Sequence, residues 1–223
     1  MKRRAWFVTG TDTGVGKTQV SSLLLRAAAA QGHSTLGLKP VAAGCESTPN
    51  GLRNDDAIAL MAASTVVLPY AQVNPVTLAE PIAPHIAAAR EHRRLRVPQL
   101  AGLVRGAMMQ ARADFTLVEG AGGWRVPLNE RESLADLAVE LKLPVLLVVG
   151  IRLGCINHAL LTAEAIHRDG LVLAGWVANE IDPGMMAADD NIATLAALLP
   201  APLLVRVGYG DTVAAIDTGG IAG

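Results

Sequence analysis

The stretch VTGTDTGVGKTQV, residues 8–20, decides the fold class of this chain. It contains GKT at residues 16–18, the close of a phosphate-binding loop. The glycine that normally stands five positions before the glycine of GKT is replaced by Thr11. The nearest earlier glycine is Gly10, so the loop is one residue longer than the usual pattern.

The neighbours of this loop have the patterns that a phosphate loop requires. An apolar run over 5–9 is typical of a buried strand, and residues 17–31 have the length and pattern of a helix. Loop glycines let backbone N–H groups converge on an anion at the helix N-terminus. We therefore predict a phosphate-binding loop in which Lys17 reaches the outer phosphates and the Thr18 hydroxyl is a ligand of Mg²⁺. Asp12 is not required for phosphate binding and could instead orient a substrate amine.

Short apolar runs alternate with helix-length segments along the whole chain, a pattern typical of crossover connections and a parallel sheet. We predict strands over residues 5–9, 35–39, 115–119, 145–149, 172–178 and 203–207. We predict helices over residues 17–31, 55–63, 97–111, 134–141, 157–168 and 187–199. The expected fold is α/β, a single-domain P-loop NTPase-like fold with a mostly parallel sheet and helices on both faces, spanning residues 1–223.

Residues at the borders of these segments add detail. Ser133 is the expected N-cap of one helix, and Gly32 and Gly170 close two others. The proline-containing segment 64–84 shows no clear period, and we predict an ordered loop there. The glycine-containing tail, residues 210–223, has little to bury, and we expect it to be poorly ordered.

Composition and charge limit the classes of function. With 223 residues, of which 51% are hydrophobic and 17% charged, the chain can bury a large core. A net charge of −1 leaves no broad footprint for nucleic acid, and we interpret the basic run 90–96 as a solvated helix end. The apolar run near the N-terminus is too short for a signal peptide, and no segment reaches the length of a membrane span. The two cysteines, Cys45 and Cys155, match no metal-ligand spacing, which suits a reduced cytoplasmic protein.

A phosphate loop needs a further metal ligand, and the run TLVEGAGGW places Glu119 at the end of a predicted strand. The glycines that follow it let the backbone approach a ligand closely, which favours a functional acid over a surface acid. Asp56 could complete the site. Asp55 and Asp56 could equally be the acidic first turn of a helix, where they stabilise its dipole.

Lys39 ends the second predicted strand, at the edge where open α/β sheets bind ligands. Its place between an apolar strand and Pro40 favours a charge-stabilising role over that of an ordinary surface lysine. The run GIRLGCINHA predicts a second helix N-terminus, and with it a second candidate anion site. Cys155 has no partner in the sequence that would make it a nucleophile, and we interpret His85 and His158 as structural.

Eight segments of the chain occur in a fixed order: VTGTDTGVGKT, KPVAAG, GLRNDDA, VNPVTLAEPIAPH, LVEGAGGWRVPL, PVLLVVGIRLGCINHALLTAEAI, LAGWVANE and PAPLL. In this order and spacing they resemble the dethiobiotin synthetase family, from about residue 5 to about residue 204. Members of that family use the lengthened phosphate loop, so the extra loop residue is a family trait.

The resemblance implies an ATP- and Mg²⁺-dependent ligase of biotin synthesis that acts on 7,8-diaminononanoate and CO₂ (bicarbonate). One substrate amine takes up CO₂ as a carbamate, and the carbamate oxygen attacks the γ-phosphate of ATP. The second amine then closes the ureido ring on the carbamic-phosphoric anhydride and releases phosphate. The resemblance also implies a homodimer, with part of each substrate site supplied by the other subunit.

The resemblance assigns roles to individual residues. The implied catalytic residues are Lys17, Lys39 and Thr13. The implied nucleotide contacts are Gly14, Val15, Gly16, Lys17, Thr18, Gln19, Asp56, Glu119, Gly120, Ala121, Gly122, Asn179, Glu180, Gly208 and Tyr209, with Asn179 reading the adenine. The implied substrate contacts are Thr13, Lys39, Ala43, Gly154, Cys155, Ile156 and Asn157, the last four from the partner subunit. The implied Mg²⁺ ligands are Thr18, Asp56 and Glu119.

Three departures from the family pattern stand near these residues. Ala43 replaces a serine that contacts substrate in many members, and Gly14 replaces a glutamate of some members. Residues 205–209 read VRVGY where the family usually has a proline-containing turn, and residues 211–223 read DTVAAIDTGGIAG in place of the expected acidic helical tail.

Two other classes of protein share parts of this pattern. A switch ATPase of the partitioning or septum-positioning kind would act through protein partners, but it carries a lysine early in the loop, where this chain has Thr-Asp-Thr at residues 11–13. An amide-forming synthetase domain of corrinoid synthesis is normally fused to a glutaminase domain, for which this chain has no room.

Overall fold

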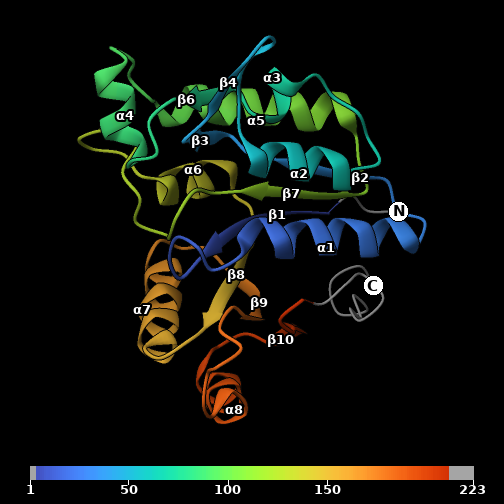
Figure 1. The fold of residues 1–223 in the computed structure, drawn as a ribbon, viewed down its shortest axis with the longest axis vertical. Helices are drawn as coiled ribbons and strands as arrows, with labels where there is room; N and C mark the ends of the chain where they lie inside the picture. Colours follow the sequence, from blue (N-terminus) through green and yellow to red (C-terminus); the bar gives the residue numbers. More distant parts are fainter. Residues whose placement is uncertain (1–3, 211–223) are drawn as a thin grey trace.

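Six parallel strands form the central sheet of the computed structural model, which describes residues 4–210 (Figure 1). They are β1 (Arg4–Gly10), β2 (Thr35–Leu38), β7 (Phe115–Glu119), β8 (Val145–Ile151), β9 (Leu173–Glu180) and β10 (Leu203–Val207). Their order across the sheet is β10-β9-β8-β1-β7-β2, and every neighbouring pair is parallel. The six predicted strands and the parallel sheet are confirmed, with strand ends displaced by two residues at most.

Helices cover both faces of the sheet, as the sequence predicts. α1 (Lys17–Ala30) packs on one face, against side chains such as Trp6, Val8 and Leu117. Phe7 and Val118, which alternate with them along the strands, face the other layer. That layer contains α5 (Val97–Ala111), α6 (Leu134–Leu141), α7 (Cys155–Arg168) and α8 (Ala188–Leu198). α2 (Asp55–Ala63) lies against β2 and α1 at the sheet edge.

The predicted helix borders follow from local chemistry. Ser133 caps α6 through a capping box with Asp136, as expected for a serine before an apolar run. Gly32 and Gly170 follow the ends of α1 and α7 and have φ of 87° and 79°, a conformation that only glycine adopts without strain. α7 begins at Cys155, two residues earlier than predicted, because Gly154 serves as its N-cap.

The prediction of a loop over residues 64–84 is wrong. The segment contains α3 (Tyr70–Val73) and β6 (Val76–Leu78), and it leads into α4 (Pro84–Arg90). β6 pairs in parallel with β3 (Val41–Ala43), a partner distant in sequence. These elements have three to seven residues, too few to show a period, and their pairing is non-local, so the local sequence carries no signal for them.

Three further features complete the described part of the chain. β4 (Glu46–Thr48) and β5 (Gly51–Arg53) form an antiparallel hairpin that the sequence did not predict. The basic run 90–96 starts at the last residue of α4 and reaches the N-cap of α5. Among residues 4–210, the helices are all too short or too polar to cross a membrane. The expectation for the tail beyond Gly210 concerns residues outside those that the structure describes.

Candidate active site

The loop between β1 and α1 depends on two glycines in a left-handed conformation. Gly14 has φ of 75° and Gly16, the N-cap of α1, has φ of 81°. A Cβ atom on Gly16 would lie 2.1 Å from Nδ2 of Asn179, so this position has neither the conformation nor the space for a side chain. The loop therefore runs directly over the end of β9.

Asn179 supports the loop from beneath. It is buried on β9, and its Nδ2 donates a hydrogen bond of 2.9 Å to the carbonyl of Val15. Its Oδ1 is also buried and accepts no hydrogen bond from the described residues. A buried carbonyl oxygen without a donor is costly, so this oxygen stands out among the polar atoms near the loop.

Lys17 is held inside the loop that it ends. Its side chain is buried, and its Nζ donates to the backbone carbonyl of Asp12 at 3.1 Å. Burial, together with the charge of nearby Lys39, lowers the pKa of Lys17 to about 8. The Asp12 carboxylate accepts from the Thr13 N–H at 2.7 Å and from Arg152 at 2.6 Å. Asp12 is thus occupied by a cation of this chain and does not line the cavity described below.

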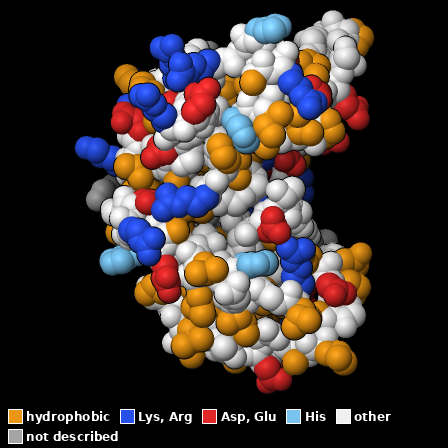
Figure 2. Space-filling view, turned by 90° about the vertical axis from the view of Figure 1, so that its left-hand side faces the viewer, with side chains coloured by type: hydrophobic (Ala, Val, Ile, Leu, Met, Phe, Trp, Pro, Cys, Tyr) orange, Lys and Arg blue, Asp and Glu red, His pale blue; other side chains and the backbone are white. Residues whose placement is uncertain are grey.

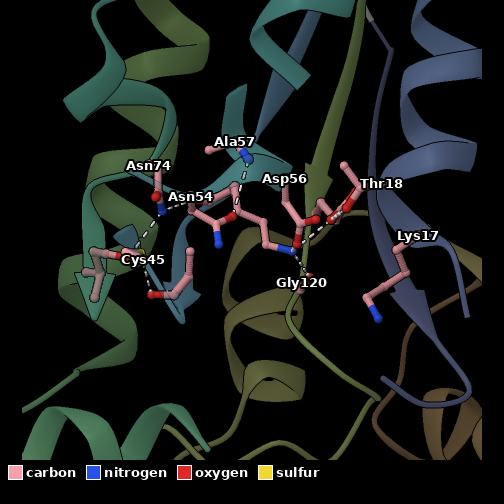
Figure 3. A network of polar contacts seen from close by, with 12 residues as sticks. Lys17, Thr18, Cys45, Asn54, Asp56, Ala57, Asn74 and Gly120 are labelled. Carbon is pink, nitrogen blue, oxygen red and sulfur yellow. Dashed lines mark hydrogen bonds and ion pairs between the residues drawn. The ribbon is translucent and has the colours of Figure 1, made fainter. Parts of the chain in front are cut away.

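Lys39 is surrounded by oxygens just beyond the end of β2. Its Nζ lies 2.8 Å from Oδ2 of Asp56, 2.8 Å from Oε1 of Glu119 and 3.2 Å from the carbonyl of Gly120. Figure 3 shows Asp56, Thr18 and Gly120 around this network. Burial by itself would lower the pKa of Lys39, but the two carboxylates outweigh it and raise the pKa. Lys39 therefore stays protonated.

Thr18 and two acids place their oxygens together. The Thr18 hydroxyl donates a hydrogen bond of 2.7 Å to Oε1 of Glu119, which is fully buried. Oε2 of Glu119 is buried without a hydrogen-bond partner in the described part of the chain. Burial alone would raise the pKa of Asp56, but Lys39 and the Thr18 hydroxyl lower it, so this carboxylate is ionised.

These three side chains fit the chemistry of Mg²⁺. All contribute oxygen atoms, and the free Oε2 of Glu119 provides an acceptor that a cation would satisfy. Within residues 4–210, no group of three or more histidine, cysteine or acidic residues forms a metal cage. A site with two carboxylates and one hydroxyl is the kind that Mg²⁺ occupies together with substrate phosphates.

A cavity of about 760 Å³ lies over these residues. The predicted site residues that line it are Thr13, Gly14, Gly16, Lys17, Thr18, Gln19, Lys39, Ala43, Asp56, Ala121 and Gly122. Glu119 is buried behind this wall, where it contacts Lys39 and Thr18. The loop, the end of β2, the start of α2 and the segment after β7 thus meet at one edge of the sheet, because the carboxyl ends of parallel strands share that edge.

Other predicted residues lie away from the cavity lining. Gly154 to Asn157 form the start of α7, and Gly208 and Tyr209 follow β10. The Glu180 carboxylate accepts a hydrogen bond from Arg206, which also pairs with Asp189 at 2.6 Å. Within one chain, therefore, the phosphate end of the predicted site is assembled in the cavity, and the predicted adenine and carboxylate ends are not.

Several lining residues were missed by the sequence interpretation. They are Ala42, Asn54, Pro81, Ile82, Ala83, Pro84, Arg125, Val126 and Pro127. Residues 81–83 lie between β6 and α4, and Pro84 is the first residue of α4, so their place depends on the unpredicted β3–β6 pair. Arg125 follows the glycines after β7, a position that could have signalled it, and its guanidinium pairs with Asp169 at 2.8 Å.

The fold and the site define a class of protein. A glycine-rich loop on a helix N-terminus that ends in Lys17 and Thr18, at the carboxyl edge of a parallel sheet, characterises P-loop nucleotide-binding proteins. The Thr18 hydroxyl is paired with the strand-end acid Glu119. Residues 4–216 match a family model described as an AAA domain.

Known relatives identify the family. The ATP-dependent dethiobiotin synthetase BioD of Cellvibrio japonicus is 62% identical over 92% of this chain and 89% of its own length. The protein of the same name from Pseudomonas paraeruginosa is 59% identical over 91% of this chain and 89% of its own length. The chain belongs to the ATP-dependent dethiobiotin synthetase family.

Solved structures at low identity share the fold alone. The septum site-determining protein MinD from Pyrococcus horikoshii, complexed with Mg-ADP, has a TM-score of 0.57 at 14% identity, covering 98% of this chain and 88% of that one. The signal recognition particle receptor FtsY from Elizabethkingia anophelis has a TM-score of 0.57 at 18% identity. That match covers 97% of this chain, which spans 62% of the FtsY chain.

Proposed function

We propose that this chain is an ATP-dependent dethiobiotin synthase that closes a ureido ring on 7,8-diaminononanoate with CO₂, consuming ATP in biotin biosynthesis. The observation that carries the proposal is the placement of two buried lysines, Lys17 and Lys39, beside one cavity in a member of this family. Reaction of a carbamate with the γ-phosphate joins two anions, and catalysis requires preorganised cations between them.

The two lysines have different environments, which suit different tasks. Lys17 faces no carboxylate within hydrogen-bond distance and donates only to a neutral carbonyl in the described structure. Its positive charge is therefore available to the β- and γ-phosphates. Lys39 is paired with Asp56 and Glu119, which fix it in place and raise its pKa, so its charged form is favoured. It is the cation we assign to the carbamate and the transferring phosphoryl group.

Mg²⁺ would be held by Thr18, Asp56 and Glu119. When bound, it would neutralise charge on the phosphates, as in other nucleotide-dependent phosphoryl transfers. The two lysines and two acids of the site carry no net charge together, so an ATP molecule needs the metal as an additional source of positive charge. Two observations support this assignment: the hydrogen bond from the Thr18 hydroxyl to Oε1 of Glu119, and the buried Oε2 of Glu119, which has no hydrogen-bond partner among the described residues.

We assign the adenine to the end of the sheet formed by β9 and β10. Asn179 has a buried carbonyl oxygen that lacks a donor, and the exocyclic amine of adenine would satisfy it. Glu180, Gly208 and Tyr209 follow or border the ends of the same two strands. An ATP molecule with its adenine at Asn179 would extend across the loop and place its phosphates at Lys17, because Asn179 contacts the loop directly.

The distal carboxylate of the substrate is assigned to the N-terminus of α7 in the partner subunit of a cytoplasmic homodimer. Gly154, with φ of 93°, is the N-cap of this 14-residue helix and supplies no side-chain cap. The N–H of Cys155 already donates to the carbonyl of Arg152 at 3.0 Å, so we assign the anion to the amides of Ile156 and Asn157. Leu153 and Leu161 beside it are 90% and 56% exposed, which favours a partner that covers them. In Figure 2 hydrophobic side chains gather on the lower part of the face shown, at the level of α7 and α8 in Figure 1.

A coupled assay tests the function. Purified protein with MgATP, bicarbonate and 7,8-diaminononanoate is expected to form dethiobiotin and to release one phosphate for each ring closed. The matched controls omit the diamine or replace it with a monoamine of equal length, which forms a carbamate and has no second amine for ring closure. Phosphate release that is independent of the diamine would instead favour a switch ATPase and would overturn the proposal.

A further inference from the structure

A buried amide outside the cavity holds the backbone of Lys39. Asn74 follows α3 and is only 2% exposed. Its Nδ2 donates to the carbonyl of Lys39 at 2.7 Å and to the carbonyl of Val76 at 3.2 Å. The N–H of Lys39 donates to the carbonyl of Val73 at 2.9 Å. Both backbone groups of Lys39 are thus bound by the same turn of chain.

The Tyr70 hydroxyl connects this amide to the helix that carries Asp56. The hydroxyl donates to Oδ1 of Asn74 at 2.9 Å and accepts from the N–H of Asn54 at 2.8 Å. Asn54 is the N-cap of α2, where its side chain accepts from the N–H of Ala57. Figure 3 shows Asn74 and Asn54 on one side of the network and Asp56 and Thr18 on the other.

These contacts form a closed circuit around the catalytic cation. One path leads from the backbone of Lys39 through Asn74, Tyr70 and Asn54 to the first turn of α2. The other leads from Nζ of Lys39 to Asp56 in that same turn. The Tyr70 hydroxyl, bonded to the Asn74 side chain and to the Asn54 N–H, therefore fixes the backbone of Lys39 relative to Asp56, the partner of its ammonium group.

We propose that Tyr70 and Asn74 are positioning residues that fix Lys39 relative to Asp56 and so place the ammonium group for the reaction. The catalytic meaning of this placement rests on the proposed function, whereas the placement itself does not. Neither residue lines the cavity, so neither is assigned a contact with substrate. A lysine side chain has four rotatable bonds, and an error of 1 Å at a reacting group costs about a hundredfold in rate.

The Tyr70 ring has a second support, which makes a selective variant possible. The guanidinium carbon of Arg53 lies 4.1 Å from the centre of the ring. Tyr70→Phe keeps this contact and the packing of the ring, and removes only the hydroxyl that links Asn54 to Asn74. Asn74→Ala removes the whole connection.

Ser34→Ala is the matched control. Ser34 precedes the first residue of β2, whereas Lys39 follows the last, so the change affects the opposite end of the same strand. The Ser34 hydroxyl donates to Asp114 at 2.6 Å and accepts from the Asp114 N–H at 2.9 Å. Like Tyr70→Phe, the control removes a hydroxyl that donates one hydrogen bond and accepts another. Its hydrogen bonds do not lead to the helix that carries Asp56.

The first readout is the side-chain nitrogen resonance of Lys39 in protein labelled with ¹⁵N-lysine. The chain has four lysines, Lys2, Lys17, Lys39 and Lys142, and Lys39→Arg identifies the signal of interest. Tyr70→Phe and Asn74→Ala are expected to shift or broaden this resonance in the nucleotide-free protein, and Ser34→Ala is expected to leave it unchanged. An unchanged Lys39 resonance in Tyr70→Phe, or an equal change in Ser34→Ala, overturns the proposal.

The second readout is steady-state kinetics of dethiobiotin formation. We expect kcat to fall about tenfold in Tyr70→Phe and about a hundredfold in Asn74→Ala, with KM for ATP within threefold of wild type. A lower melting temperature with unchanged kcat would mean a structural role only and would overturn the proposal. If Asn74→Ala does not fold, Tyr70→Phe decides alone. If the wild-type protein forms no dethiobiotin, the proposed function fails, and the resonance of Lys39 still decides the placement.

Discussion

The Nζ atom of Lys39 lies 2.8 Å from Oε1 of Glu119, and both side chains are buried. Before any substrate binds, the cation that we assign to the reaction is therefore neutralised by an acid that we assign to the metal. A metal ion bound to Glu119 would compete with Lys39 for the same carboxylate. More of the positive charge of Lys39 would then be available to the substrate. Under the proposed function, metal binding would therefore increase the availability of the Lys39 charge, and removal of that charge is the first test.

Loss of the Lys39 ammonium group should abolish most activity without unfolding the protein. Lys39→Ala is expected to reduce dethiobiotin formation about a hundredfold or more, because a preorganised charge at the transferring phosphoryl group is removed. Lys142→Ala, at an exposed lysine beyond the end of α6, is the control and should retain full activity. Near-normal turnover in Lys39→Ala, with circular dichroism like that of wild type, would contradict the assignment.

Binding of ATP should weaken as the pH rises above about 8. The pKa of Lys17 is lowered to about 8 in the free protein, so Lys17 loses its charge above that pH unless bound phosphate retains the proton. The dissociation constant of MgATP, measured by calorimetry without diamine, is expected to rise up to about tenfold per pH unit between pH 8 and 9.5.

Lys17→Arg separates this effect from other titrations. A guanidinium group stays charged throughout the range, so the variant should bind with lower affinity but with a flat profile up to pH 9.5. A profile that is equally steep in Lys17→Arg, or flat in wild type, would rule out Lys17 as the titrating group.

A methyl group at Gly16 should disrupt the loop more than one at Gly14. Both glycines have positive φ, and alanine in that conformation costs about 1–2 kcal/mol. A Cβ atom at Gly14 meets nothing within 4 Å, whereas one at Gly16 meets Asn179 at 2.1 Å. Gly16→Ala is therefore expected to lower the free energy of unfolding by more than Gly14→Ala does, as measured by urea denaturation.

The double variant Gly16→Ala/Asn179→Ala isolates the clash from the backbone strain. In the Asn179→Ala background the clash is absent. There, Gly16→Ala should lower the free energy of unfolding only as much as Gly14→Ala does in the wild-type protein. Additive losses in this cycle would show that Asn179 does not constrain the loop.

Two differently inactivated subunits should restore activity when mixed. Lys17→Ala removes the phosphate side of a site, and Asn157→Asp sets a negative charge against the substrate carboxylate. If each site uses Asn157 of the partner subunit, a mixed dimer has one site with both lesions and one intact site. Random exchange of equal amounts should therefore restore about a quarter of wild-type activity, since half of the dimers are mixed.

Subunit exchange and dimer formation are checked by size-exclusion chromatography of tagged and untagged chains. A mixture that exchanges fully but stays as inactive as its components would place Gly154 to Asn157 in the site of their own subunit, or outside any site.

The sequence by itself determined the sheet and the phosphate end of the site. The apolar runs are long enough to show burial on both faces, and their alternation with helices implies parallel strands. Because parallel strands present their carboxyl ends at one edge, the positions of Lys17, Lys39 and Glu119 at strand or loop ends were sufficient to predict that they meet. The glycines of the loop added the local backbone geometry.

The tertiary structure alone decided how these groups are paired and held. That Lys39 is shared by Asp56 and Glu119 depends on side-chain directions that no spacing encodes. The support by Asn74 comes from a segment whose elements are too short to show a period, and whose strand pairs with a distant partner. A buried amide in such a segment looks like any polar loop residue in the sequence, because its value depends on the carbonyls that folding brings to it.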